Sequence, residues 1–302
     1  MKFLISGASG LIGSALVASL ASRGDEVVTL VRPSTATARS ASVTWNPAEG
    51  TIDQEGLQRT GPFDAVIHLA GAGIADKRWT SARKAEIATS RTASTDLLAR
   101  SIARLDRPPS AFVCGSAIGF YGDRGDEVLT EDASGGAGFL ADVCHSWESA
   151  ASPAIDAGIR TSFARTGIVL SAKGGALAKQ LPLFKLGLGG KLSTGSQWMS
   201  WISIGDEIAA LRFLATDERA AGPVNLTAPG ALRNADFTRR LGRSLHRPAV
   251  FVIPAPALRL ALGSQLVDEA LLASARVEPR RLLDLGFHFS QPSLEEALHA
   301  FL

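Results

Sequence analysis

Three glycines spaced three residues apart give this sequence its clearest chemical signal. Gly7, Gly10 and Gly13 follow a short apolar run over residues 2–5 and precede an alanine-rich segment. Glycine allows a backbone geometry and a close approach that a side chain would block, and the free N–H groups at a helix start favour a bound anion. The pattern predicts a strand, a tight turn and a helix that hold the pyrophosphate of a dinucleotide through Gly7, Ser9, Gly10, Leu11 and Ile12.

The residue after the second predicted strand bears on the choice of dinucleotide. An apolar strand over residues 26–31 would complete a strand–helix–strand unit of about 30 residues. In such folds an acid at this point binds the ribose 2′-hydroxyl, whereas an arginine accommodates a 2′-phosphate. Arg32 follows this strand, and no acid stands beside it. We therefore expect NADP(H); the alternative is that Arg32 is a solvated residue after a strand.

Two further side chains stand at places where a cofactor could lie. A predicted strand over residues 65–69 contains His68 near its end, and a predicted helix over residues 79–105 carries Arg91. We favour a packed histidine over a catalytic one, because the sequence places no carboxylate or hydroxyl beside it. Arg91 is either a charge-assisted contact to a phosphate or an exposed helix residue paired with Glu86 or Asp96.

Taken together, these stretches resemble the extended branch of the short-chain dehydrogenase/reductase superfamily. The shared features are the G-x-x-G-x-x-G spacing, an H-x-A-[AG] strand end at residues 68–71, and a helix pattern at residues 91–98. Residues 77–80, 90–91, 139–141, 147–148 and 186–190 narrow the resemblance to atypical members, often labelled epimerase-family proteins, that have their own C-terminal region.

This resemblance covers the whole chain and implies its fold. It implies an α/β protein with a doubly wound parallel Rossmann sheet and a smaller C-terminal α/β lobe on the substrate side. We expect an NADP-binding Rossmann domain over residues 1–170, to which the chain returns at about 196–228, and a substrate-side lobe with a C-terminal helical region over 171–302. It further implies cofactor contacts at His68, Leu69, Ala70, Glu86, Arg91, Ser116, Thr166, Gly167 and Ile168.

Some local elements can be predicted from pattern alone. Residues 161–170 are expected to form one strand, the sixth of the sheet. Asn234 is expected to be the N-cap of a helix, and Ser293 with Glu296 to form a capping box that opens the last helix.

The usual proton-transfer pair of the superfamily is missing. Related enzymes use a tyrosine as general acid/base, with a lysine four residues later that lowers the pKa of the phenol. Tyr121 is the single tyrosine, and Gly125 stands four residues after it. The expected positions map to Leu140 and Cys144, or to the residues just before them, so either register leaves an apolar helix face.

Two hydroxyls remain as catalytic candidates. Ser116 follows a predicted strand over residues 111–115, where the family carries its catalytic serine. Tyr121 matches a family tyrosine that commonly neighbours the substrate. Neither one comes with a cation that would tune a proton donor, since a free phenol has a pKa near ~10.

The predicted substrate half departs from the sugar-nucleotide enzymes. Residues 197–206 resemble the pattern Q-x-R-D-F-x-H-V-x-D, but Met199 replaces the arginine that grips the substrate's phosphates. A nucleotide-sugar substrate is therefore not expected. Trp198 and Trp201 suggest an apolar or aromatic substrate surface, although core packing is the commoner role of such tryptophans. Arg165 is also expected on the substrate side.

Composition excludes other classes of protein. A net charge of +2 without a basic cluster disfavours nucleic acid, and no segment has the ~18 unbroken apolar residues of a membrane span. Cys114 and Cys144 form neither a CxxC motif nor a zinc set. We expect no metal, a cytoplasmic location and a small-molecule substrate, and the oligomeric state is left open.

Three functions are compatible with this pattern. The first is an NADP(H)-dependent oxidoreductase acting on a small, fairly apolar carbonyl compound or alcohol. The second is a non-catalytic NADPH-binding sensor or assembly factor, which would keep the cofactor clamp without the chemistry. The third is an epimerase or isomerase that retains its cofactor, which the missing tyrosine and lysine disfavour.

Overall fold

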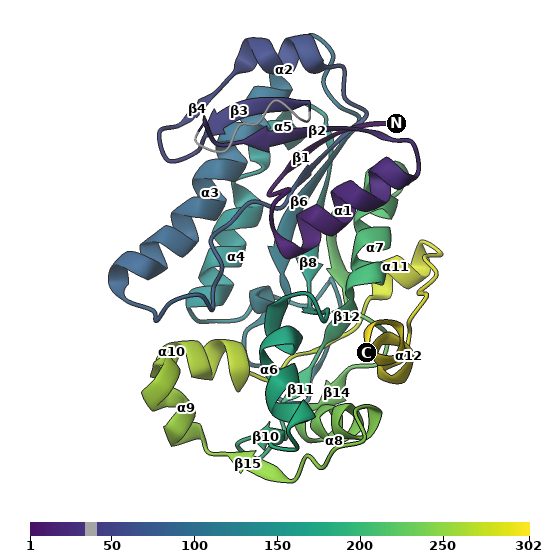
Figure 1. The fold of residues 1–302 in the computed structure, drawn as a ribbon. Coiled ribbons are helices and arrows are strands. Elements are labelled where there is room, and N and C mark those ends of the chain that lie inside the picture. The colour runs from purple at the N-terminus through teal and green to yellow at the C-terminus, as the bar shows by residue number, and fades with distance from the viewer. Residues whose placement is uncertain (34–40) are drawn as a thin grey trace.

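A single large sheet forms the centre of the molecule. The computed structural model describes residues 1–33 and 41–302, and its sheet has eight strands in the order β13-β8-β6-β5-β1-β2-β3-β4 (Figure 1). Neighbouring strands run parallel except β3 and β4. The strands are β1 (Lys2–Ser6), β2 (Glu26–Val31), β3 (Ser42–Asn46), β4 (Thr51–Ile52), β5 (Ala65–His68), β6 (Ala111–Ala117), β8 (Arg160–Thr166) and β13 (Gly222–Leu226).

The order of the strands defines where a ligand can bind. From β1 the chain continues to β2 and β3 on one side and then crosses to β5, β6 and β8 on the other. Such a reversal leaves a crevice at the carboxyl ends of the two strands that flank it, here β1 and β5. The expected doubly wound parallel sheet is therefore confirmed, with the switch point beside the glycine turn.

Helices cover both faces of the sheet because its strands are apolar at consecutive positions. Phe3 and Ile5 pack against α1 (Leu11–Ser22) and α7 (Ile204–Thr216). Leu4, between them, points to the opposite face, which α3 (Ser81–Ala103), α4 (Phe139–Ser149) and α5 (Ser152–Asp156) cover. The short helix α2 (Gln54–Thr60) adds Leu57 to this second core.

The expected sixth strand is two strands with different partners. β8 ends at Thr166, and after Gly167 the chain continues as β9 (Ile168–Leu170), which pairs with β12 (Trp201–Ser203) outside the main sheet. At Gly167 the backbone passes so close to its neighbour that a Cβ would lie 2.7 Å from the carbonyl oxygen of Ser200. The apolar pattern runs through both strands, so it could not reveal the change of partner.

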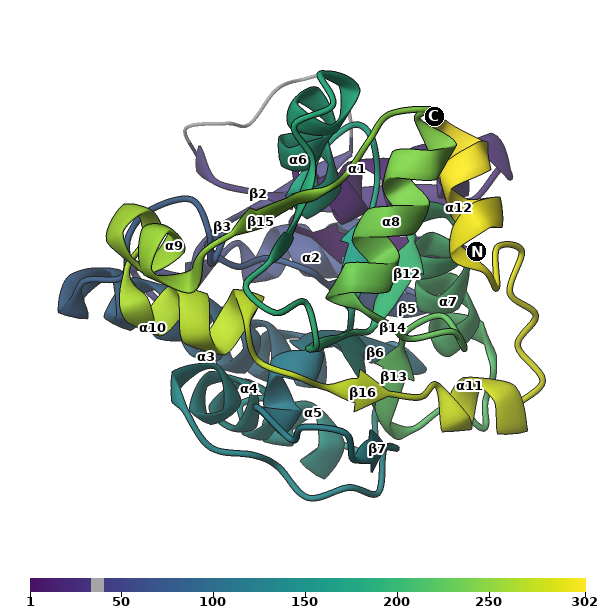
Figure 2. The ribbon, with the colours of Figure 1, turned by 90° about the horizontal axis from the view of Figure 1, so that it is seen from below.

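The C-terminal half adds a smaller lobe beside the carboxyl edge of the sheet (Figures 1 and 2). A separate apolar core, which includes Phe184, Trp201 and Phe237, holds this lobe together. Its elements are α6 (Gly175–Lys185), β10 (Gly190–Leu192), β11 (Trp198–Met199), β14 (Leu232–Arg233), α8 (Asn234–Ser244), β15 (Phe251–Ile253), α9 (Ala255–Leu262), α10 (Ser264–Leu266), the π-helical turn η3 (Val267–Leu271) and α12 (Leu294–Phe301). Short elements join it to the sheet: η2 (Ile118–Tyr121), β7 (Val128–Leu129), β16 (Arg276–Val277) and α11 (Arg280–Asp284).

Two helix starts test the local predictions. The capping box at Ser293 is confirmed: its N–H donates to Glu296 Oε2 at 2.9 Å, and the Glu296 N–H donates back to its hydroxyl at 3.3 Å. The prediction for Asn234 was wrong, because Arg233 is the N-cap of α8. Asn234 Oδ1 accepts the Leu192 N–H at 2.8 Å and so ties α8 to β10. Within the described residues, no helix is long and apolar enough to cross a bilayer.

Candidate functional site

The turn between β1 and α1 can only be made with glycine. Gly7 has a positive φ of 70°, and a Cβ on it would lie 2.7 Å from the Leu69 carbonyl carbon. A Cβ on Gly13 would lie 2.2 Å from the Gly7 carbonyl oxygen. These close approaches bring the carboxyl ends of β1 and β5 together under the start of α1.

The start of α1 fits an anion. Gly10 is its N-cap, and no side chain among the described residues caps it. The first N–H groups of a helix have no partner inside the helix, and they carry its positive dipole end. Ser9, Gly10 and Leu11 also border a hollow of about 870 Å³ that reaches the start of α7. The backbone here therefore suits the pyrophosphate that the sequence predicts. Arg32 follows β2 directly and is exposed.

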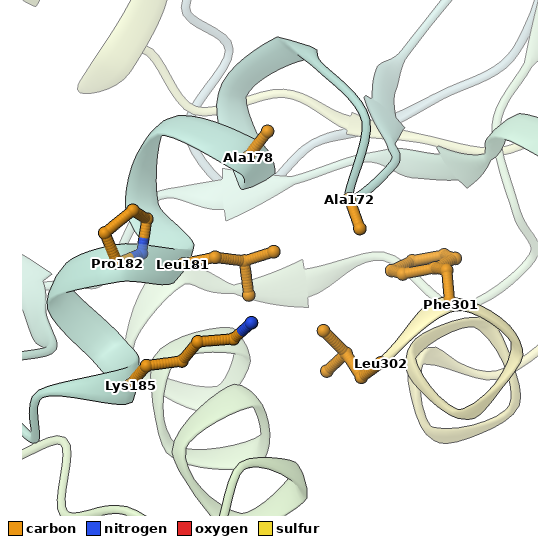
Figure 3. Close-up of a pocket in the computed structure, with 7 residues that line it drawn as sticks. All are labelled: Ala172, Ala178, Leu181, Pro182, Lys185, Phe301 and Leu302. Atoms are coloured by element: carbon orange, nitrogen blue, oxygen red, sulfur yellow. The ribbon is translucent and has the colours of Figure 1, made fainter.

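A second hollow lies away from the glycine turn. It has a volume of about 360 Å³ and opens between α6 and the last turn of α12 (Figure 3). Its lining is apolar except for Lys185, and it contains none of the residues predicted for the cofactor or the substrate. We assign it no role in the site.

His68 is a buried structural residue. Ser6 Oγ accepts the N–H groups of Leu69 and Ala70, so its own proton points to His68 Nδ1 at 2.6 Å. The remaining ring nitrogen, Nε2, then carries the proton and donates to Ser94 Oγ at 3.1 Å. Burial, with a smaller contribution from nearby Arg91, lowers the pKa of His68 to about 3. The preference for a packed neutral histidine over a catalytic one is supported by these contacts.

Arg91 lies against the loop that follows β5. Its Nη1 donates to the carbonyl oxygens of Ala72 and Ile87, both at 3.0 Å, and its guanidinium stands 5.0 Å from the Trp147 ring. The expected alternative partners are taken by other arginines: Glu86 accepts from Arg83 and Asp96 from Arg100. Arg91 is thus half-buried beside the strand end, and its contact with a phosphate stays a prediction.

Ser116 belongs to a buried ion-pair network. Its hydroxyl donates to Glu148 Oε1 at 2.7 Å. Arg165 grips the same carboxylate with Nε at 2.8 Å and Nη2 at 2.9 Å, and the two side chains are only 4% and 12% exposed. β6 and β8 are in register at Ser116 and Arg165, so both face α4, which carries Glu148. Because the serine proton points to Glu148, Ser116 offers only lone pairs to a ligand.

Tyr121 closes the other side of this network. It is fully buried; its hydroxyl accepts from Arg165 Nη1 at 3.0 Å and donates to Asn225 Oδ1 at 2.7 Å. Burial raises the pKa of Tyr121 above its ordinary value, in spite of the adjacent guanidinium. The hydroxyl is buried and donates its only proton to Asn225, so a substrate oxygen receives that proton only if the Asn225 contact breaks. The predicted place of Tyr121 beside the reacting oxygen is therefore not favoured by this geometry.

The structure selects one register for the missing tyrosine and lysine. Leu140 and Cys144 face the segment after β6, because a Cβ on Gly119 would lie 3.4 Å from Leu140 Cβ and 3.7 Å from Cys144 Sγ. The Cys144 thiol points to the Ala117 carbonyl at 3.7 Å. Burial raises the pKa of Cys144 to about 12, so it stays protonated at neutral pH. Both positions are apolar, as the sequence predicts, whereas Glu148, one turn further along the same face, brings a carboxylate.

Thr166 faces the opposite side of the sheet from Arg165. Its hydroxyl donates to Glu207 Oε1 at 2.8 Å, and Glu207 on α7 is fully buried. Burial raises the pKa of Glu207 to about 8. Gly167 and Ile168 follow, where the chain leaves the main sheet, and their predicted contact with the nicotinamide end stays a prediction.

Sequence reasoning missed Glu148 and Glu207, although each leaves a trace. Glu148 stands four residues after Cys144 and eight after Leu140, and so shares their helix face. Glu207 stands three residues before Ala210 and four before Leu211, which point into the core. An acidic residue three or four positions from core residues of the same helix is the sequence signal that could have predicted these two acids.

The two predicted substrate-side tryptophans have different surroundings. Trp201 is fully buried and donates to the Gly230 carbonyl at 3.0 Å, so it is a core residue. Trp198 is half-buried, with the guanidinium groups of Arg233 and Arg276 at 4.9 Å and 4.8 Å from its ring and Asp126 accepting from its indole at 2.7 Å. The expected apolar surface is thus a mixed aromatic and cationic one. In residues 1–33 and 41–302 no cluster of three His, Cys, Asp or Glu side chains could hold a metal ion.

Comparison with known proteins agrees with this geometry. The family described as NAD dependent epimerase/dehydratase matches residues 3–137, and a domain of unknown function, DUF1731, matches residues 253–301. Epimerase family protein Mb2239 of Mycobacterium bovis is 42% identical over 294 residues, which cover 97% of this chain and 95% of that protein.

Solved structures extend the comparison. The crystal structure of human epimerase family protein SDR39U1 with NADPH matches with a TM-score of 0.89 and 32% identity, over 100% of this chain and 99% of that one. The Thermus thermophilus UDP-glucose 4-epimerase complex with NAD, at 16% identity and a TM-score of 0.75, covers 99% of this chain and 96% of that one and shares the fold alone. The fold and the glycine turn define an extended short-chain dehydrogenase/reductase. The chain belongs, within that class, to the SDR39U1-like epimerase family proteins with a C-terminal DUF1731 region.

Proposed function

We propose that this protein binds NADP(H) and acts as an oxidoreductase on a small, fairly apolar carbonyl compound or alcohol. The cofactor assignment is supported by the uncapped start of α1, by Arg32 after β2 and by the NADPH in the human SDR39U1 structure. The N–H groups of Leu11 and Ile12 would hold the pyrophosphate and Arg32 the 2′-phosphate. When bound, the nicotinamide would supply or accept a hydride.

The observation that carries the substrate class is the apolar face of α4. Leu140 and Cys144 stand opposite the segment after β6, where the superfamily has a phenol and an ammonium group. Leu140 and Cys144 offer no partner to a charged substrate group. The Glu148 and Arg165 charges beside Cys144 are already paired with each other, so such a group would lose hydration with little compensation. Met199 likewise replaces the arginine that would bind a diphosphate. Together these residues favour a small, uncharged, mainly apolar substrate.

The hydrogen bond of Ser116 favours an alcohol over a ketone as the substrate. Its proton is held by Glu148, so it accepts a hydrogen bond and binds best to a group that brings an O–H or N–H. An alcohol therefore fits beside it better than a ketone. Arg165 binds both oxygens of the Glu148 carboxylate, which fixes this orientation.

The second candidate is a non-catalytic NADPH-binding sensor or assembly factor. It is favoured by two observations: the only proton of the Tyr121 hydroxyl is donated to Asn225, and the Cys144 thiol is too weak an acid. An epimerase with a retained cofactor needs the same missing proton donor and comes third. The free thiols of Cys114 and Cys144 support a reducing compartment, and we place the protein in the cytoplasm.

A single experiment separates the first two candidates. Wild-type protein is loaded with NADPH or NADP⁺ and tested on matched panels of apolar ketones, aldehydes and their alcohols, following the absorbance of the reduced nicotinamide. We expect turnover that Ser116→Ala abolishes, while Ser149→Ala, on the exposed side of α4, leaves it unchanged. Stoichiometric NADPH binding with no turnover on any panel member would favour the non-catalytic candidate.

A further inference from the structure

One segment of the C-terminal lobe reaches back to the Rossmann half. It runs from Phe251 to Leu271, through β15, α9, α10 and η3, and we name it the strap. Its first element, β15, pairs with β10 in the lobe. Further along, the strap passes beside the starts of α3 and α4 (Figures 1 and 2). It lies almost wholly within the match to DUF1731.

The middle of the strap is weakly packed. All eight residues of α9 are described and none is buried; Leu260 is 80% exposed. A short helix that buries no side chain gains little stability from packing, so polar contacts must hold it. Arg78, in the loop after β5, donates to the Leu260 carbonyl at 3.3 Å. Within the strap, Arg259 pairs with Asp268.

The strap is fastened to α4 by a carboxylate. Glu269 Oε2 accepts the N–H of Leu140 at 2.9 Å, and Gln265 holds its other oxygen at 2.8 Å. Gly138, the N-cap, provides no side chain of its own, and a Cβ on it would lie 3.2 Å from the Glu269 carboxyl carbon. Lys84 at the start of α3 donates to Gln265 at 3.1 Å. A carboxylate at a helix start is stabilised by the dipole of that helix.

A glycine stands where the strap can bend. Gly263 separates α9 from α10 and has a φ of +96°, a conformation that other residues rarely adopt. Its Cα lies close to Arg78, because a Cβ there would be 3.3 Å from Arg78 Nε. Rotation at this glycine would let α9 turn away from Arg78 once the Glu269 contact that holds the strap is released.

We propose that the strap is a closure over the cofactor site, fastened by Glu269 and Arg78, that opens for NADP(H) exchange. The strap contacts the loop after β5 and the start of α4. Both lie beside the carboxyl edge of the sheet, where α/β sheets of this kind bind their ligands. A ligand that binds better under the closed strap shifts the population toward closure. The proposal rests on the proposed NADP(H) binding.

The first test uses the protein without ligand. Trypsin cleavage after Arg259 and amide hydrogen exchange over residues 255–271 report opening of the strap. Glu269→Ala is expected to speed cleavage about tenfold, the ratio expected from losing one charge-assisted hydrogen bond. Glu269→Gln, which keeps an acceptor, should be cleaved at a rate between those of wild type and Glu269→Ala. Glu295→Gln, which changes an exposed acid on α12 outside the strap, should be cleaved as slowly as wild type.

Exchange at β1 and β6 shows whether the variants stay folded. If Glu269→Ala protects these strands as wild type does but leaves cleavage and strap exchange unchanged, Glu269 is no fastening and the proposal is wrong. If α9 exchanges as slowly as β1 in wild type, the strap does not open at all, which also overturns it.

The second test adds NADPH. Saturating NADPH should slow cleavage after Arg259 in wild type, and Glu269→Ala should release NADPH faster in a stopped-flow displacement experiment. NADPH that binds but leaves cleavage unchanged would refute the closure and leave the proposed function intact. If NADPH fails to bind wild type, the proposed function falls, and the ligand-responsive closure with it.

Discussion

Removing the Glu148 carboxylate should cost this protein a large part of its stability. Glu148 neutralises Arg165, whose side chain is only 4% exposed. Without the acid, the Tyr121 hydroxyl and the rings of Phe120 and Tyr121 remain beside the guanidinium, and none of them is an anion. Breaking a buried pair on one side costs about 3–5 kcal/mol, because the remaining charge stays buried without a partner. The Ser116 hydroxyl also loses its acceptor, which adds roughly 1 kcal/mol.

The assay is urea unfolding of Glu148→Ala, followed by far-UV circular dichroism, with Glu295→Ala as the control. Glu295 pairs with Arg240 at an exposed site, where ion pairs contribute about 0–1 kcal/mol. Replacing both members, Glu148→Leu with Arg165→Met, should recover much of the loss, since no buried charge is left unpaired. If Glu148→Ala costs no more than the control, the buried network does not exist as described.

Three further predictions concern single residues. Gly13→Ala should weaken NADPH binding at least about tenfold, because its Cβ would lie 2.2 Å from the Gly7 carbonyl oxygen, whereas Gly205→Ala meets only ordinary contacts; equal affinities in titration would contradict this. The folded-state pKa of Glu207, about 8, lies above its ordinary 4.5, so the unfolded chain ionises first and stability relative to Glu207→Gln should fall from about pH 5 to about pH 8. If the stabilities of wild type and Glu207→Gln changed with pH in parallel, Glu207 would not be buried. NMR should find no titration of the His68 ring between about pH 5 and pH 8, since its pKa is about 3; a midpoint near neutrality would contradict its burial.

Local patterns in the sequence were enough to predict the glycine turn and individual strands, whereas the doubly wound sheet was predicted from the family resemblance. The apolar run before Gly7 and the three glycines act within a few residues, so their geometry is encoded where they stand. The apolar face at Leu140 and Cys144 follows from helical spacing for the same reason. The capping box at Ser293 needs no more than four consecutive residues.

The chemistry of the site depends on partners far apart in the chain. Glu148 meets Ser116 across 32 residues, and Thr166 meets Glu207 across 41, so only the folded sheet brings them together. The setting of Trp198 likewise depends on Arg276, which arrives with the last part of the lobe. The residue types predicted that these side chains could take part in chemistry. The hydrogen bonds and ion pairs that they form with one another decide which of them are available to a ligand.

The preference of the protein for NADPH over NADH can be measured directly. Titration of wild type and Arg32→Ala with both nucleotides, followed by quenching of tryptophan fluorescence, measures the four dissociation constants. Wild type is expected to bind NADPH several-fold more tightly than NADH, and Arg32→Ala to lose this preference, because the 2′-phosphate is the only difference between the ligands. Equal binding of NADPH and NADH by wild type would contradict this expectation.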